Sequence, residues 1–224
     1  MSELQGEALV ETLERQFVTV NDDVRVGGRA INVLRPRSAE DLIDEQEFDR
    51  DERLPYWAEL WPSSTVLADF VITQNNVPKR CIELGCGVGL VSIAAVLAGH
   101  EVLATDYYEE ALRFTRANSF RNLGREIDTR VVDWRAMPDD LPQFDMALAS
   151  DVLYEPRYAP LVADVIARVI APTGCAYIAD PGRVAAATFI DACSERGMRV
   201  AAQAERPYLA GKVRQTITVY EIRR

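Results

Sequence analysis

Arg80-Cys-Ile-Glu-Leu-Gly-Cys-Gly-Val-Gly-Leu90 opens the stretch of sequence that decides the fold, and Glu101-Val-Leu-Ala-Thr-Asp106 closes it. The apolar residues before the glycines predict a short buried strand. Gly85, Gly87 and Gly89 let the backbone turn tightly and approach a ligand. The opening part is therefore typical of a strand that runs into a ligand-binding turn.

The residues that follow complete a unit of strand, turn, helix and strand. Val88 to Ala98 is an apolar, alanine-rich run that predicts a helix closed by Gly99. Val102 to Ala104 predict a second buried strand, which ends at Asp106. That acid lies about 20 residues after the turn, where a ribose hydroxyl pair is typically held. The unit predicts a half-domain that cradles a nucleotide.

The residues around the turn favour one kind of nucleotide. A dinucleotide-binding turn has its third glycine at the position of Leu90, because its helix must lie close to a pyrophosphate. Glu83, directly before the loop, favours a ligand with positive charge. S-adenosylmethionine (SAM) has no phosphate and carries a sulfonium and an ammonium group. Glu83 to Gly89 resembles motif I of the class I SAM-dependent methyltransferases, so SAM is the expected cofactor and a dinucleotide is the alternative.

Composition fits one compact enzyme domain. Of the 224 residues, 48% are apolar and 12 are glycine, which allows a substantial core without a low-complexity linker. The sequence has no apolar run of transmembrane length, and its first residues are rich in glutamate, so we expect a cytoplasmic protein that does not bind membranes. The four cysteines form no C-x-x-C pair and are expected to be buried free thiols rather than metal ligands.

The charge balance bears on possible partners. A formal net charge of -10 disfavours nucleic-acid binding, which depends on clustered Lys and Arg, and suits basic or neutral substrates. Residues 40–53 hold eight Asp and Glu against two Arg, a net charge of -6. This run is either a solvated face or, because it leads into the aromatic segment Pro55–Pro62, a surface that steers a cationic substrate.

Alternating strand and helix patterns continue to the end of the chain. We expect helices over 107–122, 156–171 and 183–196, and strands over 129–132, 144–149 and 175–179. Residues 198–204 and 213–222 predict a closing antiparallel pair, which is typical of the seven-stranded methyltransferase sheet. The expected fold is α/β, a Rossmann-like doubly wound sheet of seven strands with a terminal antiparallel pair.

Residues 1–54 are predicted to form an N-terminal extension packed on the core. Residues 4–15 have a helical pattern, and residues 17–34 predict two or three short strands around turn signals at Asn21–Asp23 and Gly27–Gly28. Residues 55–224 are then expected to form the SAM-binding domain.

Residues just after each strand are the candidates for a site, because ligands of open sheets lie beyond the carboxyl ends of the strands. In this chain they are Glu83 and Gly85, Asp106, Asp133 and Trp134, Ser150 and Asp151, and Asp180 to Arg183. Five acids and an indole at one rim exceed what helix capping requires. Asp133 is placed to accept a hydrogen bond from the amino group of an adenine.

A second resemblance narrows the class. Asp151-Val-Leu-Tyr154 matches the D-x-x-Y signature after strand four of the seven-beta-strand protein lysine methyltransferases grouped as methyltransferase family 16. Pro55-Tyr-Trp-Ala-Glu-Leu-Trp-Pro62 and Asp180-Pro-Gly-Arg183 look closest to the branch that contains the electron-transfer-flavoprotein beta-subunit lysine methyltransferase. The similarity covers about residues 50–222, and residues 1–45 match no pattern we can name.

This resemblance implies site residues. It implies a cofactor site made of Trp61, Glu83, Gly85, Gly87, Gly89, Asp106, Tyr107, Asp133, Trp134 and Ser150. It also implies that Asp151 and Tyr154 face the acceptor nitrogen as catalytic residues. Methyl transfer is an in-line displacement, so positioning supplies much of the acceleration, and a lysine must lose its proton because its free pKa is about 10.4. Asp151 is expected to orient the amine, and Tyr154 to offer its ring face or its hydroxyl.

Several of these roles have structural alternatives. In the structural alternative, Tyr154 only caps the crevice and Asp151 only begins a turn. Arg183 would either bind a substrate carboxylate or pair with Asp180. Trp61 and the tryptophan four residues before it would form one core face of a helix.

Three functions are compatible with these observations. The first, which we favour, is a SAM-dependent N-methyltransferase acting on lysine side chains of a partner protein. The second is a small-molecule N-methyltransferase acting on a small amine, since fold and cofactor motif do not fix the acceptor. The third is a noncatalytic SAM-fold interaction protein, which the intact glycines and rim acids disfavour.

Overall fold

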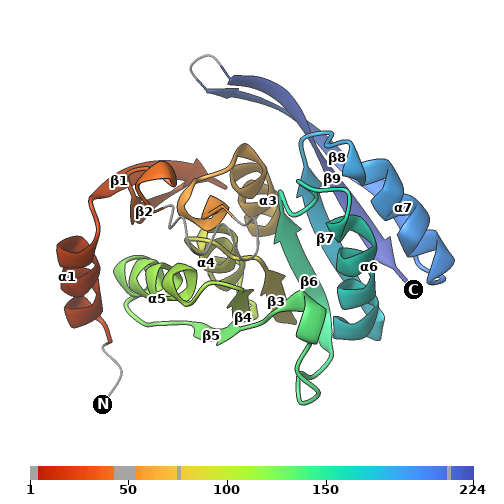
Figure 1. Cartoon of the computed structure of the whole chain (residues 1–224), viewed down its shortest axis with the longest axis horizontal. Coiled ribbons are helices and arrows are strands. Elements are labelled where there is room, and N and C mark those ends of the chain that lie inside the picture. Colours follow the sequence, from red (N-terminus) through yellow and green to blue (C-terminus); the bar gives the residue numbers. More distant parts are fainter. Residues whose placement is uncertain (1–4, 43–53, 75–76, 211–212) are drawn as a thin grey trace.

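The computed structural model describes residues 5–42, 54–74, 77–210 and 213–224, and Figure 1 shows their arrangement. The core is a seven-stranded sheet in the order β5-β4-β3-β6-β7-β9-β8. Its strands are β3 (Arg80–Leu84), β4 (Glu101–Asp106), β5 (Asp128–Val131), β6 (Phe144–Ser150), β7 (Ile170–Asp180), β8 (Arg199–Ala210) and β9 (Val213–Arg223). The first five are parallel, and β9 runs antiparallel to β7 and β8. The predicted doubly wound α/β fold with its terminal antiparallel pair is confirmed.

Helices cover both faces of this sheet (Figure 1). α3 (Pro62–Thr73), α4 (Leu90–Leu97) and α5 (Glu109–Leu123) pack together on one face, and α6 (Tyr158–Val169) and α7 (Ala185–Glu195) pack together on the other. Each layer buries its own hydrophobic cluster, with Phe114 fully buried in one and Phe189 in the other. Because β3 and β6 are covered on both sides, most of their residues are apolar, as expected for parallel strands.

The strand order places a switch point between β3 and β6. The chain proceeds from β3 outward to β4 and β5, and then returns to the opposite side of β3 to form β6. The connections after β3 and β6 therefore leave the sheet in opposite directions, which opens a crevice at the carboxyl ends of these strands.

The segment before β3 differs from its sequence interpretation. Residues Tyr56–Ala58 form a 3-10 helix, and Trp61 precedes α3, which was not predicted. Pro62 takes the first helical position, where its missing N–H costs nothing. Trp57 and Trp61 therefore share no helix, and the alternative that they form one helical core face is wrong.

The N-terminal residues form a helix and one hairpin. α1 (Glu7–Gln16) is followed by β1 (Thr19–Val26) and β2 (Arg29–Pro36), which pair antiparallel about a turn at 27–28. The expected break at Asn21–Asp23 is absent because these residues continue β1. Asn118 and Asn122 of α5 bond through their side chains to the backbone of β2, which ties the hairpin to the helix layer.

A long arm leaves the sheet at its carboxyl edge. β7 ends at Asp180 opposite Thr218, whereas the pairing of β8 with β9 continues outward as far as Ala210 and Val213. The sequence pattern ended β8 at residue 204, since the alternation is interrupted near a bulge between Ala202 and Ala204. The resulting two-stranded arm (residues 205–210 and 213–217) extends from the body in Figure 1.

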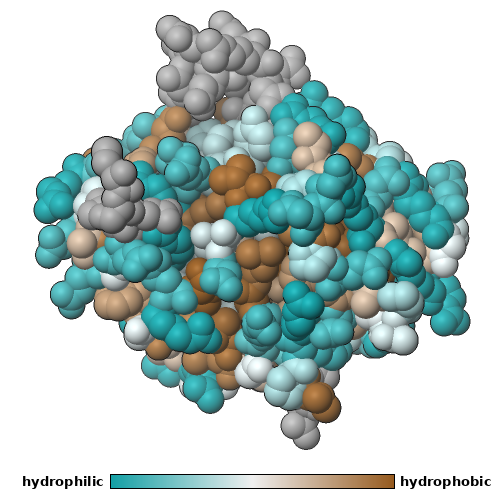
Figure 2. All heavy atoms as spheres, turned by 90° about the horizontal axis from the view of Figure 1, so that it is seen from below, coloured by the Kyte–Doolittle hydropathy of each residue, from teal (hydrophilic) through white to brown (hydrophobic). Residues whose placement is uncertain are grey.

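The remaining expectations concern surfaces and thiols. Figure 2 shows one face on which hydrophilic residues dominate the margin and apolar residues gather in the middle. All four cysteines are buried and free, as predicted. Within the described part of the chain, no helix combines the length and apolarity needed to cross a membrane.

Candidate active site

A cavity of about 330 Å³ lies at the switch point and is lined by residues that follow the carboxyl ends of the strands. Ten predicted site residues line it: Trp61, Gly85, Gly87, Asp106, Tyr107, Asp133, Trp134, Ser150, Asp151 and Tyr154. They come from the loops after β3, β4, β5 and β6 and from the segment before α3. The fold therefore brings together residues that are up to 93 positions apart, as Trp61 and Tyr154 are. Glu83 and Gly89 do not contribute to this lining.

Glu83 is buried in the core instead of facing the cavity. Its side chain is 1% exposed, and its carboxyl accepts a hydrogen bond from the hydroxyl of Ser92 on α4. Burial raises the pKa of this carboxyl to about 8, so at neutral pH the group is mostly uncharged. An uncharged, buried Glu83 offers no charge that would select a cationic ligand, and its contact with the cofactor stays a prediction.

The glycines of the loop have different reasons to be glycine. A Cβ on Gly87 would lie 3.1 Å from the carbonyl oxygen of Trp57, so the segment before α3 can pass directly over the loop. A Cβ on Gly89 would lie 2.8 Å from Oγ1 of Thr115, and the φ of Gly89 is 89°. Gly89 thus allows α4 to begin closely packed against α5, and its approach to a ligand stays a prediction.

Asp106 joins the end of β4 to the glycine loop. Its Oδ2 accepts from the backbone N–H of Gly87 at 2.9 Å, and its Oδ1 accepts from that of Tyr108 at 3.0 Å. A carboxylate offers about four acceptor sites, more than these two backbone bonds occupy. The side chain is 7% exposed and lines the cavity.

Asp133 has a structural partner in addition to its place in the lining. Its carboxylate caps the short helix that begins at Trp134 by accepting from the backbone N–H of Arg135, and it pairs with the guanidinium of Arg135 at 2.9 Å. That guanidinium also lies 5.7 Å from the ring centroid of Tyr107. Asp133 can contact an adenine only through the acceptor capacity that these bonds leave.

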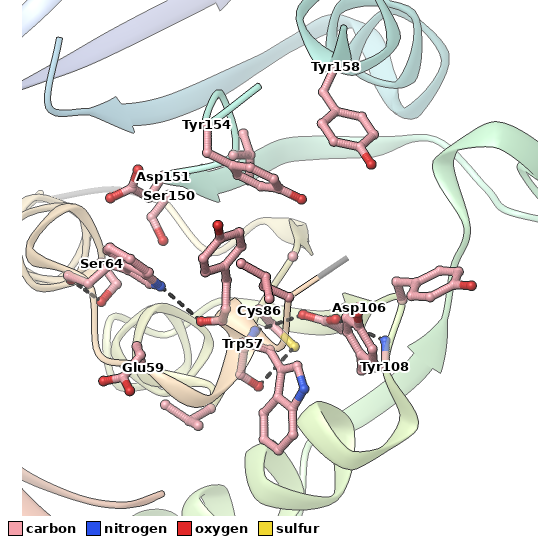
Figure 3. A pocket seen from close by; sticks show the side chains of 18 of the residues that line it. Trp57, Glu59, Ser64, Cys86, Asp106, Tyr108, Ser150, Asp151, Tyr154 and Tyr158 are labelled. Atoms are coloured by element: carbon pink, nitrogen blue, oxygen red, sulfur yellow. Dashed lines mark hydrogen bonds between the residues drawn. The ribbon is translucent and has the colours of Figure 1, made fainter. Parts of the chain in front are cut away.

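An aromatic wall connects the two sides of the cavity. The ring of Tyr56 lies edge-on to Trp61, with centroids 5.9 Å apart, and edge-on to Tyr154 at 5.3 Å. Tyr154 in turn lies 5.5 Å from Tyr158 at the start of α6. The indole N–H of Trp61 donates to the carbonyl oxygen of Tyr56 at 2.9 Å. In Figure 3, Tyr154 and Asp151 lie across the cavity from Asp106 and Tyr108.

Asp151 has an unusual backbone and an unexpected partner. Its φ is 57°, the only positive value among the described residues other than glycine, and Asp is one of the few residues that tolerate it. Its Oδ1 accepts from Nε of Arg183 at 2.8 Å and pairs with Nη2 at 2.7 Å. The expected side-chain pair of Arg183 with Asp180 is therefore not seen, because the guanidinium binds Asp151 and the backbone N–H of Arg183 binds Asp180. Binding of a substrate carboxylate by Arg183 stays a prediction.

Several lining residues were not assigned to the site from the sequence. Tyr56, Glu59 and Tyr158 line the cavity. Tyr56 belongs to the aromatic segment noted before α3, and Tyr158 lies at the start of α6, four residues after Tyr154. Most of the acidic run at 40–53 lies outside the described residues, so its predicted steering role stays untested.

The composition of the lining fits SAM. Among the described residues, five carboxylates and one guanidinium line the cavity, at Glu59, Asp106, Asp133, Asp151, Glu155 and Arg183. This excess of acids suits a ligand with a sulfonium and an ammonium group and would repel a pyrophosphate. Aromatic side chains from four different loops offer surfaces on which an adenine can stack.

The fold and this site define a class I SAM-dependent methyltransferase. The solved structure of magnesium protoporphyrin IX methyltransferase from Synechocystis with bound SAM has the same fold, with a TM-score of 0.58 at 17% identity over 82% of this chain and 94% of that chain. A family model described as lysine methyltransferase matches residues 47–196. The chain belongs to this family.

Two curated relatives are similar to this chain over part of their length. Protein-lysine methyltransferase METTL21E of Mus musculus is 39% identical over 112 residues, which are 44% of this chain and 46% of the relative. The electron transfer flavoprotein beta subunit lysine methyltransferase of Xenopus laevis is 30% identical over 133 residues, which are 58% of this chain and 53% of the relative. The chain spans about half the length of the curated relatives it matches.

Proposed function

We propose that this chain transfers a methyl group from SAM to the side-chain amine of a lysine in a partner protein. One observation carries the proposal: Gly87 and Asp106, expected at the cofactor, and Asp151 and Tyr154, expected at the acceptor, line the same cavity. An amine that enters on one side can therefore meet a methyl group presented from the other. Membership of the lysine methyltransferase family supports the same acceptor group.

The residues on the acceptor side would act by positioning. SAM supplies a methyl carbon on a sulfonium, which leaves as a neutral thioether when the amine lone pair forms the new carbon–nitrogen bond. The acceptor lysine has to release its proton to solvent before this step. The aromatic wall would hold the lysine chain and exclude water, and Asp151 would fix the direction of the amine.

The identity of the partner protein is a narrower question. The segments Pro55–Pro62 and Asp180–Arg183 resemble the electron-transfer-flavoprotein branch, whereas the aligned identity is higher for the METTL21E relative. The name of one relative states the electron transfer flavoprotein beta subunit, and the name of the other states only a protein lysine, so no particular partner is transferred to this chain. The proposal is restricted to an exposed lysine of a protein.

Incubation of the purified chain with methyl-labelled SAM and a cell lysate tests the proposal. We expect label in the protein fraction that is recovered as methyl-lysine after hydrolysis. The Asp151→Asn variant is the control for contaminating activity, and calorimetric titrations with SAM and with NAD establish which nucleotide binds.

The possible outcomes separate the alternatives. Label in the small-molecule fraction would establish the small-amine methyltransferase, and label in methyl-arginine would exclude lysine as the acceptor. Binding of SAM without any transfer would favour the noncatalytic interaction protein. Binding of NAD and not of SAM would overturn the cofactor assignment.

A further inference from the structure

The segment Asp180-Pro-Gly-Arg183 forms a tight turn directly after β7. Oδ1 of Asp180 accepts from the backbone N–H of Gly182 at 2.8 Å and from that of Arg183 at 2.7 Å. Gly182 has a φ of 85°, a conformation that favours glycine. The turn reverses the chain at the carboxyl edge and thereby presents the side chain of Arg183 to the cavity.

The guanidinium of Arg183 contacts two other segments. Both Nε and Nη2 lie within 2.8 Å of Oδ1 of Asp151, and the guanidinium carbon lies 5.7 Å from the ring centroid of Trp61. The remaining oxygen of Asp151, Oδ2, accepts one longer bond of 3.3 Å from Ser63. Among the described residues, Oδ2 is thus the Asp151 oxygen with the greater capacity to accept a bond from an incoming amine.

We propose that Arg183 is a positioning residue for methyl transfer, which holds Asp151 through Oδ1 and offsets its negative charge at the point where the acceptor amine enters. This inference rests on the proposed function. An unpaired carboxylate beside the amine would stabilise the ammonium, which has no lone pair for attack on the methyl carbon. With Arg183 in place, Asp151 can direct the amine while the pair carries little net charge.

The other charged groups around Asp151 do not replace this effect. Asp180 at the end of β7 is fully buried, and burial raises the pKa of its carboxyl, although the backbone N–H groups of the turn oppose that shift. Ser63 of α3 is uncharged. Glu59 and Glu155 line the same cavity and add negative charge. Of the described lining residues, Arg183 is the basic one.

Binding of the SAM analogue sinefungin reports on the net charge of the Asp151–Arg183 pair and needs no methyl acceptor. A carbon that bears a primary amine replaces its methylated sulfur, so the amine occupies the place of the transferred methyl group. S-adenosylhomocysteine has no charge there. The ratio of the two dissociation constants, measured by calorimetry, therefore reports the local electrostatic field.

Arg183→Met should tighten sinefungin relative to S-adenosylhomocysteine by about tenfold, since Asp151 is left unpaired. The ratio should stay near the wild-type value in Arg183→Lys, which keeps the charge, and should return toward it in Arg183→Met combined with Asp151→Asn. With labelled SAM and a fixed lysate, the pH midpoint for methyl transfer should rise by about one unit in Arg183→Met.

A purely structural role would lower the melting temperature of Arg183→Met and leave both the ratio and the pH midpoint unchanged, which would overturn the inference. A weaker acceptor affinity with an unchanged pH midpoint would instead identify Arg183 as a substrate contact. Failure of wild-type protein to bind either nucleotide would be a failure of the proposed function, because the ratio is defined only when both bind.

Discussion

Oδ2 of Asp106 accepts a hydrogen bond from the backbone N–H of Gly87 at 2.9 Å, so the expected ribose ligand also fixes the loop on which the cofactor would lie. This double role changes what removal of the side chain should do. Loss of Asp106 takes away the expected charged acceptor for the ribose and also removes two hydrogen bonds, from the N–H groups of Gly87 and Tyr108.

Asp106→Ala should weaken SAM binding about tenfold to a hundredfold, because hydrogen bonds to a charged group contribute about 1.5–3 kcal/mol. It should also lower the melting temperature of the protein without ligand, because its 7% exposed side chain supports two backbone groups. Asp106→Asn keeps one acceptor oxygen, so its SAM affinity and melting temperature should lie between those of wild type and Asp106→Ala. Calorimetric titration and thermal unfolding measure both effects, and unchanged SAM affinity in Asp106→Ala would exclude Asp106 as the ribose ligand.

Asn118 links the N-terminal hairpin to the glycine loop. Its Oδ1 accepts from the N–H of Leu34, and its Nδ2 donates to the carbonyl oxygens of Leu34 at 2.8 Å and Val88 at 2.9 Å. Asn118→Ala should destabilise the fold by about 1–3 kcal/mol, because buried backbone groups lose their partners. It should also weaken SAM binding, because the glycine loop loses the bond from Asn118 to the carbonyl oxygen of Val88.

Asn122 is the matched control for this prediction. It makes the same pair of bonds to the backbone of Asn32 but has no bond to the loop. Its Nδ2 also donates to the carbonyl oxygen of Asn118 at 2.8 Å, a contact within α5. Asn122→Ala should therefore lower the melting temperature and leave SAM affinity within about twofold, because none of these bonds reaches the glycine loop. Equal losses of SAM affinity in both variants would show that the hairpin as a whole, rather than the Val88 contact, supports the loop.

Glu83 predicts a pH dependence of stability. Burial of the carboxyl raises the pKa of Glu83 from its ordinary value of 4.5 to about 8 in the folded protein. The folded state therefore binds a proton that the unfolded chain releases between these pH values, so stability present at low pH is lost as pH rises toward 8. The slope is about 1.4 kcal/mol per pH unit.

Glu83→Gln keeps the shape and the capacity to accept from Ser92 but cannot ionise. The difference in unfolding free energy between variant and wild type should grow in favour of the variant from pH 5 to pH 8. Denaturant unfolding at several pH values measures this difference, and parallel pH profiles for the two proteins would contradict a raised pKa of Glu83.

The sequence predicted the sheet well and the polar contacts of the site less well. Alternation of apolar runs and the glycine turn depend on local sequence, so strands and most helices were predicted near their observed bounds. Sequence position indicated that Glu83 adjoins the loop, but in a strand neighbouring residues point to opposite faces, and only the fold shows that Glu83 is buried against Ser92. The pairing of Arg183 with Asp151 joins residues 32 positions apart across two loops, which no local pattern encodes.

Asp151 and Tyr154 should separate cofactor binding from chemistry. Asp151→Asn preserves a residue that tolerates the positive φ of 57°, so the fold should survive. We expect SAM affinity within a few fold of wild type and methyl transfer reduced at least about a hundredfold, which corresponds to roughly 2.7 kcal/mol of transition-state stabilisation. Wild-type rates in Asp151→Asn would return this residue to a structural role.

Tyr154→Phe distinguishes the ring from the hydroxyl. The phenylalanine keeps the edge-on contact with Tyr56, whose ring centroid is 5.3 Å away. If the ring face holds the cation, transfer should fall by less than about tenfold, whereas a loss as large as that of Asp151→Asn would assign the role to the hydroxyl. Single-turnover transfer of labelled methyl groups to lysate protein measures the rate.

The arm formed by β8 and β9 tests whether the acceptor is a protein. It extends beyond the edge at which the cavity lies, and Leu209 on it is 68% exposed. A protein acceptor would contact this surface, and a small amine would not reach it. Leu209→Ser should therefore lower the initial rate with lysate protein by about fivefold to tenfold, as for an interface residue that contributes more than about 1 kcal/mol. SAM affinity and melting temperature should not change, since the side chain is mostly in solvent.

Val77→Ser is the matched control, because Val77 is 79% exposed and lies before β3, at the opposite edge of the sheet. Equal rates for both variants and wild type would remove the arm from substrate recognition.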